Sequence, residues 1–178
     1  MLLTKDIFLP DGRTLIGVAN ETGGFIYNDA FSTGELEELQ SEYHETIEQS
    51  KMHALHDLHV ALGQGGIISK EYFRNRVVIV VSDSAFTGLA YKMAADFLKT
   101  VKVQKVVMVA PIASVQAVDV LHVAADDVEF LQIFEFPFEV NHYYEQHDLP
   151  EHNAILNILN DIILNWHPET KPTQQTKV

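Results

Sequence analysis

The residues best suited to chemistry follow an apolar run in the middle of the chain. Residues 76–88 read RVVIVVSDSAFTG, so five β-branched residues give way abruptly to small and polar ones. This loop carries one carboxylate, Asp83, and an amphipathic helical pattern, LAYKMAADFLKT, follows it directly. A buried strand, a tight polar loop and a helix N-terminus make a socket for an anion, because unpaired N–H groups and the positive end of the helix dipole converge there. The segment therefore predicts a pocket for a phosphate and its ribose.

A simpler interpretation of the same loop stays open. Asp83 or Ser84 has the right side chain to cap the helix that begins near residue 87, and the loop is then an ordinary strand-to-helix turn. A second candidate site is a helix carrying His53, His56 and His59 beside Asp57. His53 and His56 share a face but His59 lies farther round, so we expect a solvated helix face and predict no metal site.

Composition narrows the classes of function. The 178 residues carry 25 acidic and 12 basic side chains, and the net charge of −13 argues against general binding to nucleic acid or anionic membranes. A polyanionic ligand would need Mg²⁺ or backbone N–H groups to neutralise it. There is no cysteine, so thiolate metal sites are excluded. We find no signal peptide and no membrane-spanning run, and we expect a cytoplasmic protein.

The elements that must position the loop can be read from periodicity. Residues 5–28 predict a small meander, with turns at Pro-Asp-Gly and Gly-Gly. Ser32 and Glu35 form a capping box, and apolar residues at three- and four-residue steps predict one long helix from there to Leu58. Glycines at 63, 65 and 66 end this helix.

From Arg76 onward, strands and helices alternate. The expected strands are residues 77–81, 106–110 and 128–134, and the expected helices are residues 87–100 and 114–124. Such alternation predicts an α/β fold with a parallel sheet covered on both faces. An aromatic segment and a closing helix at 154–166 would complete a single domain of residues 1–166, and residues 167–178 have the composition of a flexible tail.

This series of segments resembles type I phosphoribosyltransferases, and most of all the small bacterial branch named predicted phosphoribosyltransferase. GVANETGGFIYND is similar to the branch's segment before its long helix, and RVVIVVSDSAFTG stands where the family has its loop for 5-phosphoribosyl 1-diphosphate (PRPP). KVVMVAPIASVQAVDVL resembles the next strand and helix, and VEFLQIFEFPFEVNHYYEQHDLPEHNAILNIL resembles the last strand and an aromatic lid. The resemblance runs from about Gly17 to Leu164 and implies a Rossmann-like, three-layer fold.

The resemblance also implies an activity and its residues. Family members bind PRPP with Mg²⁺, transfer ribose-5-phosphate to a nitrogenous base and release pyrophosphate. Asp83 would hold the ribose hydroxyls as the catalytic residue, and His142 and Tyr143 in the lid would contact the base. The whole PRPP loop would be Ser82, Asp83, Ser84, Ala85, Phe86, Thr87 and Gly88.

The loop departs from the family pattern. Ser82 replaces the first of two acids, Ser84 a glycine, Phe86 a small residue and Ala90 a second threonine. Loss of one charge-assisted hydrogen bond costs about 1.5–3 kcal/mol, or roughly a tenfold to hundredfold loss of affinity. Whether the protein is catalytic is therefore left open. The alternative is a non-catalytic module that regulates or completes a homologous partner.

A further departure concerns the start of the fold. The family's first strand-loop-helix-strand unit, whose loop grips pyrophosphate, has no counterpart before the meander. The strand at 77–81 should then have an uncovered edge, and an apolar unpaired edge is an aggregation hazard. We expect the meander, a second copy or another subunit to cover it. Lys70, Arg74 and Arg76 precede this strand and form either a basic flap or an exposed solubilising loop.

Overall fold

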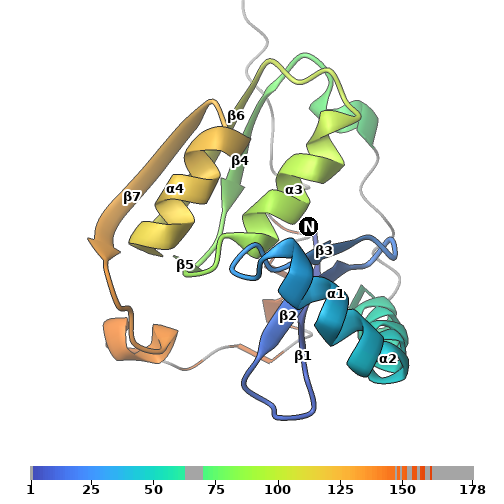
Figure 1. Ribbon diagram of the computed structural model, residues 1–178. Helices are drawn as coiled ribbons and strands as arrows, with labels where there is room; N and C mark the ends of the chain where they lie inside the picture. Colours follow the sequence, from blue (N-terminus) through green and yellow to red (C-terminus); the bar gives the residue numbers. More distant parts are fainter. Residues whose placement is uncertain are drawn as a thin grey trace, which may run out of the picture. The chain divides into compact units, whose positions relative to one another are not determined.

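The structure is a computed structural model that describes residues 2–62, 70–146, 148, 150–151, 154–155, 157–158 and 161 (Figure 1). The chain divides into two compact units, Met1–Phe138 and Glu139–Val178. The described residues of the second unit include the helical turn η2 (Val140–Tyr143). The expected domain of residues 1–166 crosses this division and stays a prediction. The closing helix and the tail lie largely outside the described residues. No described helix is long and apolar enough to cross a membrane.

The expected meander forms a small antiparallel sheet. Its strands are β1 (Thr4–Phe8), β2 (Leu15–Asn20) and β3 (Phe25–Tyr27), in the order β1-β2-β3. The Asp11 carboxylate closes the first turn by accepting hydrogen bonds from the amides of Arg13 and Thr14, both at 2.9 Å. The Thr14 hydroxyl, the Thr14 amide and the Arg13 amide together hold the pKa of Asp11 below its usual range. The turn residues predicted from the sequence are thus confirmed.

The expected long helix is two helices, α1 (Thr33–Glu42) and α2 (His44–Leu62). The capping box of Ser32 and Glu35 is confirmed at the start of α1. The prediction of one continuous helix was wrong at Tyr43, where φ is −110° and ψ is 19°. Residues of both helices pack on the same cluster of β1 and β2 side chains. Residues on both sides of the break at Tyr43 thus contact the meander.

The parallel sheet is built from β4 (Val77–Val81), β6 (Lys105–Ser114) and β7 (Asp127–Phe134), with β6 in the middle. A two-residue strand, β5 (Ser84–Ala85), also pairs with β6. Helix α3 (Leu89–Lys99) connects β4 to β6, and α4 (Val115–Ala124) connects β6 to β7. The expected strands and helices are confirmed, except that β6 continues to Ser114 instead of ending at residue 110.

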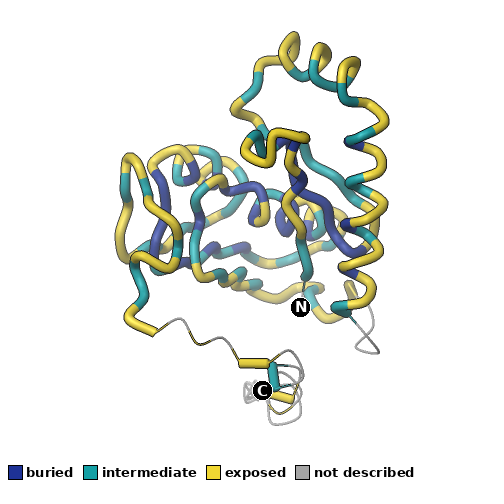
Figure 2. Tube along the Cα trace, turned by 90° about the horizontal axis from the view of Figure 1, so that it is seen from below, coloured by how far each residue is buried: buried dark blue, intermediate teal, exposed yellow. Residues whose placement is uncertain are grey.

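Both helices pack on the same face of this sheet. Along the chain, β6 is added beside β4 and β7 beside β6, so the sheet grows in one direction. Two right-handed crossovers in the same direction must place α3 and α4 over one face. Their contacts form a core with Met108 and Ala110 of β6, and Ala117 and Leu121 of α4 are fully buried in it. Leu89 and Met93 of α3 also pack against Val18 of β2, so α3 connects the two sheets. Many of the buried residues accordingly belong to α3, β2 and β6. Figure 2 marks the buried segments of the chain in dark blue.

The expectation that helices cover both faces was wrong for the described part of the chain. On the other face of the sheet, Ile79 is 61% exposed, Val81 is 69% exposed and Leu131 is 85% exposed. Val77 and Ile133 are also exposed. The reason is topological, because no described strand is added beyond β4 in the opposite direction, and only such a strand would bring a crossover helix to this face.

Replacing Met93 by alanine should destabilise the protein, because its side chain is 3% exposed and joins α3 to the meander. Its sulfur also accepts a hydrogen bond from the side-chain Nδ2 of Asn20 at 3.2 Å. We expect Met93→Ala to lower the free energy of unfolding by about 2–4 kcal/mol, measured by urea denaturation. Met52→Ala is the matched control, because Met52 is 71% exposed. Equal losses in the two variants would contradict the bridging role of α3.

Candidate functional site

Asp83 lies at the carboxyl end of β4, as the sequence predicted. The Ser82 amide still bonds to the Val109 carbonyl oxygen at 3.2 Å, so the ladder to β6 reaches this residue. Asp83 is exposed, and its carboxylate accepts from the hydroxyls of Ser82 at 3.1 Å and Ser84 at 3.4 Å. The two serines therefore hold the one carboxylate of the loop toward solvent.

The backbone of the loop differs from the continuous nest that we expected. Ser84 and Ala85 form β5 and pair in parallel with Ile112 and Ala113 of β6. Groups that bond to a neighbouring strand are not available to a ligand. The candidate residues are therefore divided into the Asp83 turn, with its two hydroxyls, and a second turn from Phe86 to Gly88.

Pro111 explains why the strand is interrupted at Asp83. β4 and β5 keep the same register against β6, since Val81 is opposite Val109 and Ser84 is opposite Ile112. Between these pairs, the amide that would continue the ladder belongs to residue 111, and proline has no N–H to donate. The loss of this bond lets the chain leave the sheet at Asp83 and return one residue later.

Ser114 anchors the second turn. Its hydroxyl donates to the Phe86 carbonyl oxygen at 2.6 Å and accepts from the Ala117 amide at 2.9 Å, so one buried side chain caps α4 and holds the turn. Gly88 follows with φ of 71°, a left-handed conformation that favours glycine. The conformation of Phe86–Gly88 is thus fixed by contacts beneath the loop.

The amides of the second turn point to the start of α3. The Thr87 hydroxyl accepts a long bond of 3.4 Å from the Leu89 amide, and Thr87 itself is exposed. Within the described residues, the amides of Thr87 and Gly88 donate to no protein atom. The first amides of any helix also lack intrahelical partners. Together these groups offer a small anion site at the positive end of the α3 dipole.

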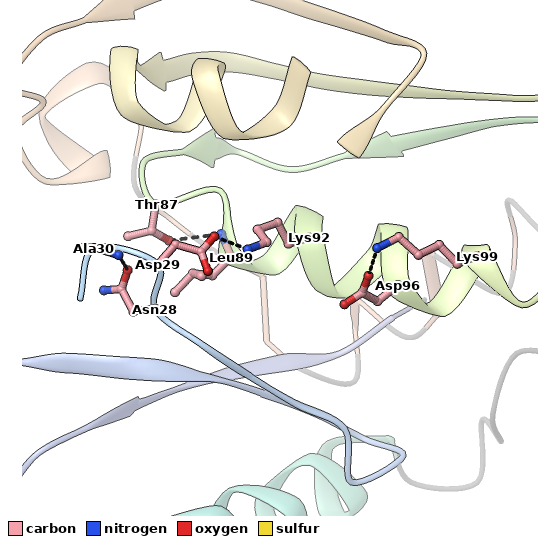
Figure 3. A network of polar contacts seen from close by, with 8 residues as sticks. All are labelled: Asn28, Asp29, Ala30, Thr87, Leu89, Lys92, Asp96 and Lys99. Carbon is pink, nitrogen blue, oxygen red and sulfur yellow. Dashed lines mark hydrogen bonds and ion pairs between the residues drawn. The ribbon is translucent and has the colours of Figure 1, made fainter. Parts of the chain in front are cut away.

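An ion pair lies beside this turn. Lys92, in the second turn of α3, pairs with Asp29 from the connection between β3 and α1, and Figure 3 shows the pair next to Thr87 and Leu89. The Lys92 side chain is 24% exposed. The cation closest along the chain to the loop is therefore neutralised by a carboxylate from the N-terminal sheet.

Three of these residues were missed by sequence reasoning. Asp29, Lys92 and Ser114 acquire their roles through contacts with residues between 28 and 63 positions away. Ser114 was readable as a helix cap, because it stands directly before the apolar pattern of α4. The pairing of Asp29 with Lys92 left no local signal, since each residue alone has the composition of an exposed surface.

The remaining candidates belong to other parts of the structure. His142 and Tyr143 belong to the second unit, where their rings meet edge to face with centroids 5.2 Å apart. Their contact with a base stays a prediction. His59 bonds to the Glu21 carbonyl oxygen at 2.9 Å, and Asp57 pairs with Lys5. Among the described residues, no three histidine or acidic side chains gather in a metal-binding arrangement.

A cavity of about 370 Å³ lies elsewhere, between the first turn of the meander and α1. Four of its lining residues are acidic, but Asp11 closes the turn and Glu35 completes the capping box. These two carboxylates therefore have structural roles, and no residue of the loop at 82–88 lines the cavity.

Comparison with known proteins shows the fold alone. No family model and no curated protein matches the chain. Among solved structures, the chain is similar to the protein TT1426 from Thermus thermophilus, with 20% sequence identity and a TM-score of 0.57. The match covers 90% of this chain and 74% of that protein. The α/β architecture, with its antiparallel N-terminal sheet and its parallel sheet flanked by helices, thus has a counterpart among crystal structures.

Replacing Ser114 by alanine should weaken both the α4 cap and the turn before α3. The buried hydroxyl makes two hydrogen bonds, and its loss leaves the Phe86 carbonyl oxygen without this donor. We expect Ser114→Ala to lower the free energy of unfolding by about 1.5–3 kcal/mol and to speed hydrogen exchange of the Ala117 amide. Ser41→Ala, at an exposed site in α1, should be nearly neutral. A neutral result at Ser114 would show that this anchor is not needed.

Proposed function

We propose that this is a phosphoribosyltransferase-like protein that binds PRPP or a nucleoside 5′-phosphate at the carboxyl end of β4. The observation that carries the proposal is the order of groups there: an exposed carboxylate at Asp83, then the unbonded amides of Thr87 and Gly88 at the N-terminus of α3. In open parallel sheets, ligands bind outside the carboxyl ends of the strands. The resemblance of residues 76–88 to a PRPP loop agrees with this position.

Each group has a distinct role in the proposal. Thr87, Gly88 and the first turn of α3 bind the 5′-phosphate through N–H and hydroxyl donors, because phosphate oxygens accept strong hydrogen bonds. The Asp83 carboxylate accepts from the ribose hydroxyls. The Ser82 and Ser84 hydroxyls now bonded to Asp83 are close enough to reorient toward the sugar.

A magnesium ion fits this scheme only when it arrives with the ligand. The loop offers a single carboxylate, and Mg²⁺ in such sites is held mainly by substrate phosphates and water. When bound, Mg²⁺ would neutralise part of the diphosphate charge. Asp83 is the side chain of the loop that could contact its hydration shell.

A second candidate function is a non-catalytic interaction module, and two observations favour it. The pairing of Ser84 and Ala85 with β6 removes backbone groups from the loop, which narrows the ligand site. The apolar side chains on the open face of the sheet are of the kind that mark protein interfaces. Transfer of ribose-5-phosphate also needs donors for the departing pyrophosphate, and the loop provides few.

Calorimetric titration of PRPP with Mg²⁺ tests the first candidate. We expect Asp83→Ala to weaken binding by about tenfold to a hundredfold, because a hydrogen bond to a charged group is lost. Thr87→Val should weaken it by about tenfold or less, because a neutral bond is lost. Asp96→Ala and Thr100→Val are matched controls near the far end of α3 and should bind like the native protein.

The test compares the PRPP affinities of the native protein, the two loop variants and the two control variants. Binding by the native protein and both controls, with losses in the two loop variants, supports the site. Absence of heat with PRPP and with adenosine 5′-monophosphate in all five proteins would remove the binding function and leave the interaction module.

Asp29→Asn should strengthen phosphate binding at the same turn. The substitution frees the Lys92 ammonium beside Thr87 and removes a negative charge that repels phosphate. We expect the dissociation constant for inorganic phosphate to fall by about threefold to tenfold at low salt, where exposed charges are weakly screened. Asp96→Asn, which frees Lys99 at the other end of α3, is the control. An unchanged affinity in Asp29→Asn would place the phosphate away from Thr87.

A further inference from the structure

The outer edge of β4 carries unused backbone groups. The Arg76 carbonyl oxygen and the Ser82 amide both bond toward β6, so the even-numbered residues of this strand direct their backbones there. Alternate residues of a strand point to opposite sides. The N–H and C=O groups of Val77, Ile79 and Val81 therefore point away from the sheet, and no described residue bonds to them.

The side chains on this strand make the edge unusual. β4 contains no charge, proline or bulge, and its three outward-bonding residues are also exposed, at 49%, 61% and 69%. Natural proteins protect a bare edge of this kind with charges, bulges or a covering element. The described meander forms its own sheet and does not pair with β4, so of the three covering elements that the sequence left open, the meander is ruled out for the described residues.

We propose that a second copy of this chain pairs with β4 edge to edge, in an antiparallel arrangement centred on Ile79. A two-fold axis at Ile79 places Ile79 opposite its own equivalent and Val77 opposite the second copy's Val81. Every residue in these pairs has its backbone directed outward. Three directly opposed pairs exchange about six N–H···O bonds, and the two sheets become one.

Charge distribution favours this orientation over a parallel one. Arg76 stands directly before β4, and Asp83 follows two residues after its end, so the strand has a basic start and an acidic end. In the antiparallel pair, the basic start of each strand lies next to the acidic end of the second copy's strand, so the charges at the two ends attract each other. A parallel pair of identical strands would instead place Arg76 near Arg76, where like charges repel each other.

The arrangement also changes the loop at residues 82–88. The start of each β4 lies at the carboxyl end of the other, so the second copy's Arg76 approaches the loop. This matters because the loop's own neighbour Lys92 is neutralised by Asp29. The contribution of Arg76 to phosphate binding rests on the proposed function, whereas the strand pairing does not.

Cross-linking of single cysteine variants tests the register of the strand pair directly, because the native chain has no cysteine. In Ile79→Cys the paired Cα atoms would lie about 5.5 Å apart, within the range of a disulfide. We expect this variant to form a covalent dimer under mild oxidation or with a short bis-maleimide. Two copies of Val77→Cys would lie about 13 Å apart along the strands and should not form a disulfide, but Val77→Cys mixed with Val81→Cys should.

Leu131→Cys is the control for the open face, since Leu131 is 85% exposed but lies on β7. Sedimentation at 0.15 M salt, where the Debye length is about 8 Å, gives the oligomeric state of the uncross-linked protein. A monomer from 1 to 100 µM would overturn the proposal, and so would a dimer that cross-links at residue 131 but not at residue 79.

A charge exchange tests the orientation. Arg76→Asp and Asp83→Arg each place like charges together, and each should raise the dimer dissociation constant by about threefold to tenfold. The double variant should restore the native value. Additive weakening in the double variant would contradict the antiparallel pair. None of these measurements uses a ligand, so a protein that dimerises but ignores PRPP refutes only the proposed function.

Discussion

The right-handed crossover is the constraint on which the rest of the unit Met1–Phe138 depends. Strands β4, β6 and β7 are added in one direction, so α3 and α4 both lie on one face, and the opposite face and the outer edge of β4 stay open. In doubly wound sheets, a second set of parallel strands is added on the other side of the first strand. The ligand crevice lies at the point where the strand order reverses. Here that point is the edge of β4. The candidate loop and the unpaired edge are therefore two consequences of the same topology.

Local signals were sufficient for most of the fold. The run Val77–Val81 matches β4 residue for residue. A short run of β-branched apolar residues between Arg76 and a polar loop strongly favours a buried strand. The capping box at Ser32 involves residues three positions apart and needs no tertiary contact. The break at Tyr43 was not predictable in this way. The sequence has no proline or glycine there, so no local signal marks the break, and residues of both helices contact the meander.

The candidate site was also predictable only as far as local sequence patterns determine it. Its position after β4 follows from local pattern, but its conformation depends on residues near 111–114, about 28 positions further along the chain. The strand predicted for residues 106–110 stops directly before Pro111, and proline is seldom found inside a central strand. In the structure Pro111 lies within β6, opposite the point where the chain leaves the sheet at Asp83. A proline inside a central strand is acceptable because the neighbouring strand is interrupted where its N–H would be needed.

The charge distribution around the loop also points to a role for the outer edge of β4. A chain with a net charge of −13 binds a phosphate only where local donors outweigh the overall repulsion. Asp29 neutralises Lys92, which leaves the loop with its amides and hydroxyls. Basic residues are concentrated instead at the start of β4, the opposite end of the strand from the loop. A single chain cannot bring its own Arg76 to its own Asp83 across an extended strand of five residues, about 17 Å long. Two chains paired in opposite directions would bring the Arg76 of one chain near the loop of the other. Pairing of the β4 edges would therefore supply the positive charge that phosphate binding at the loop lacks.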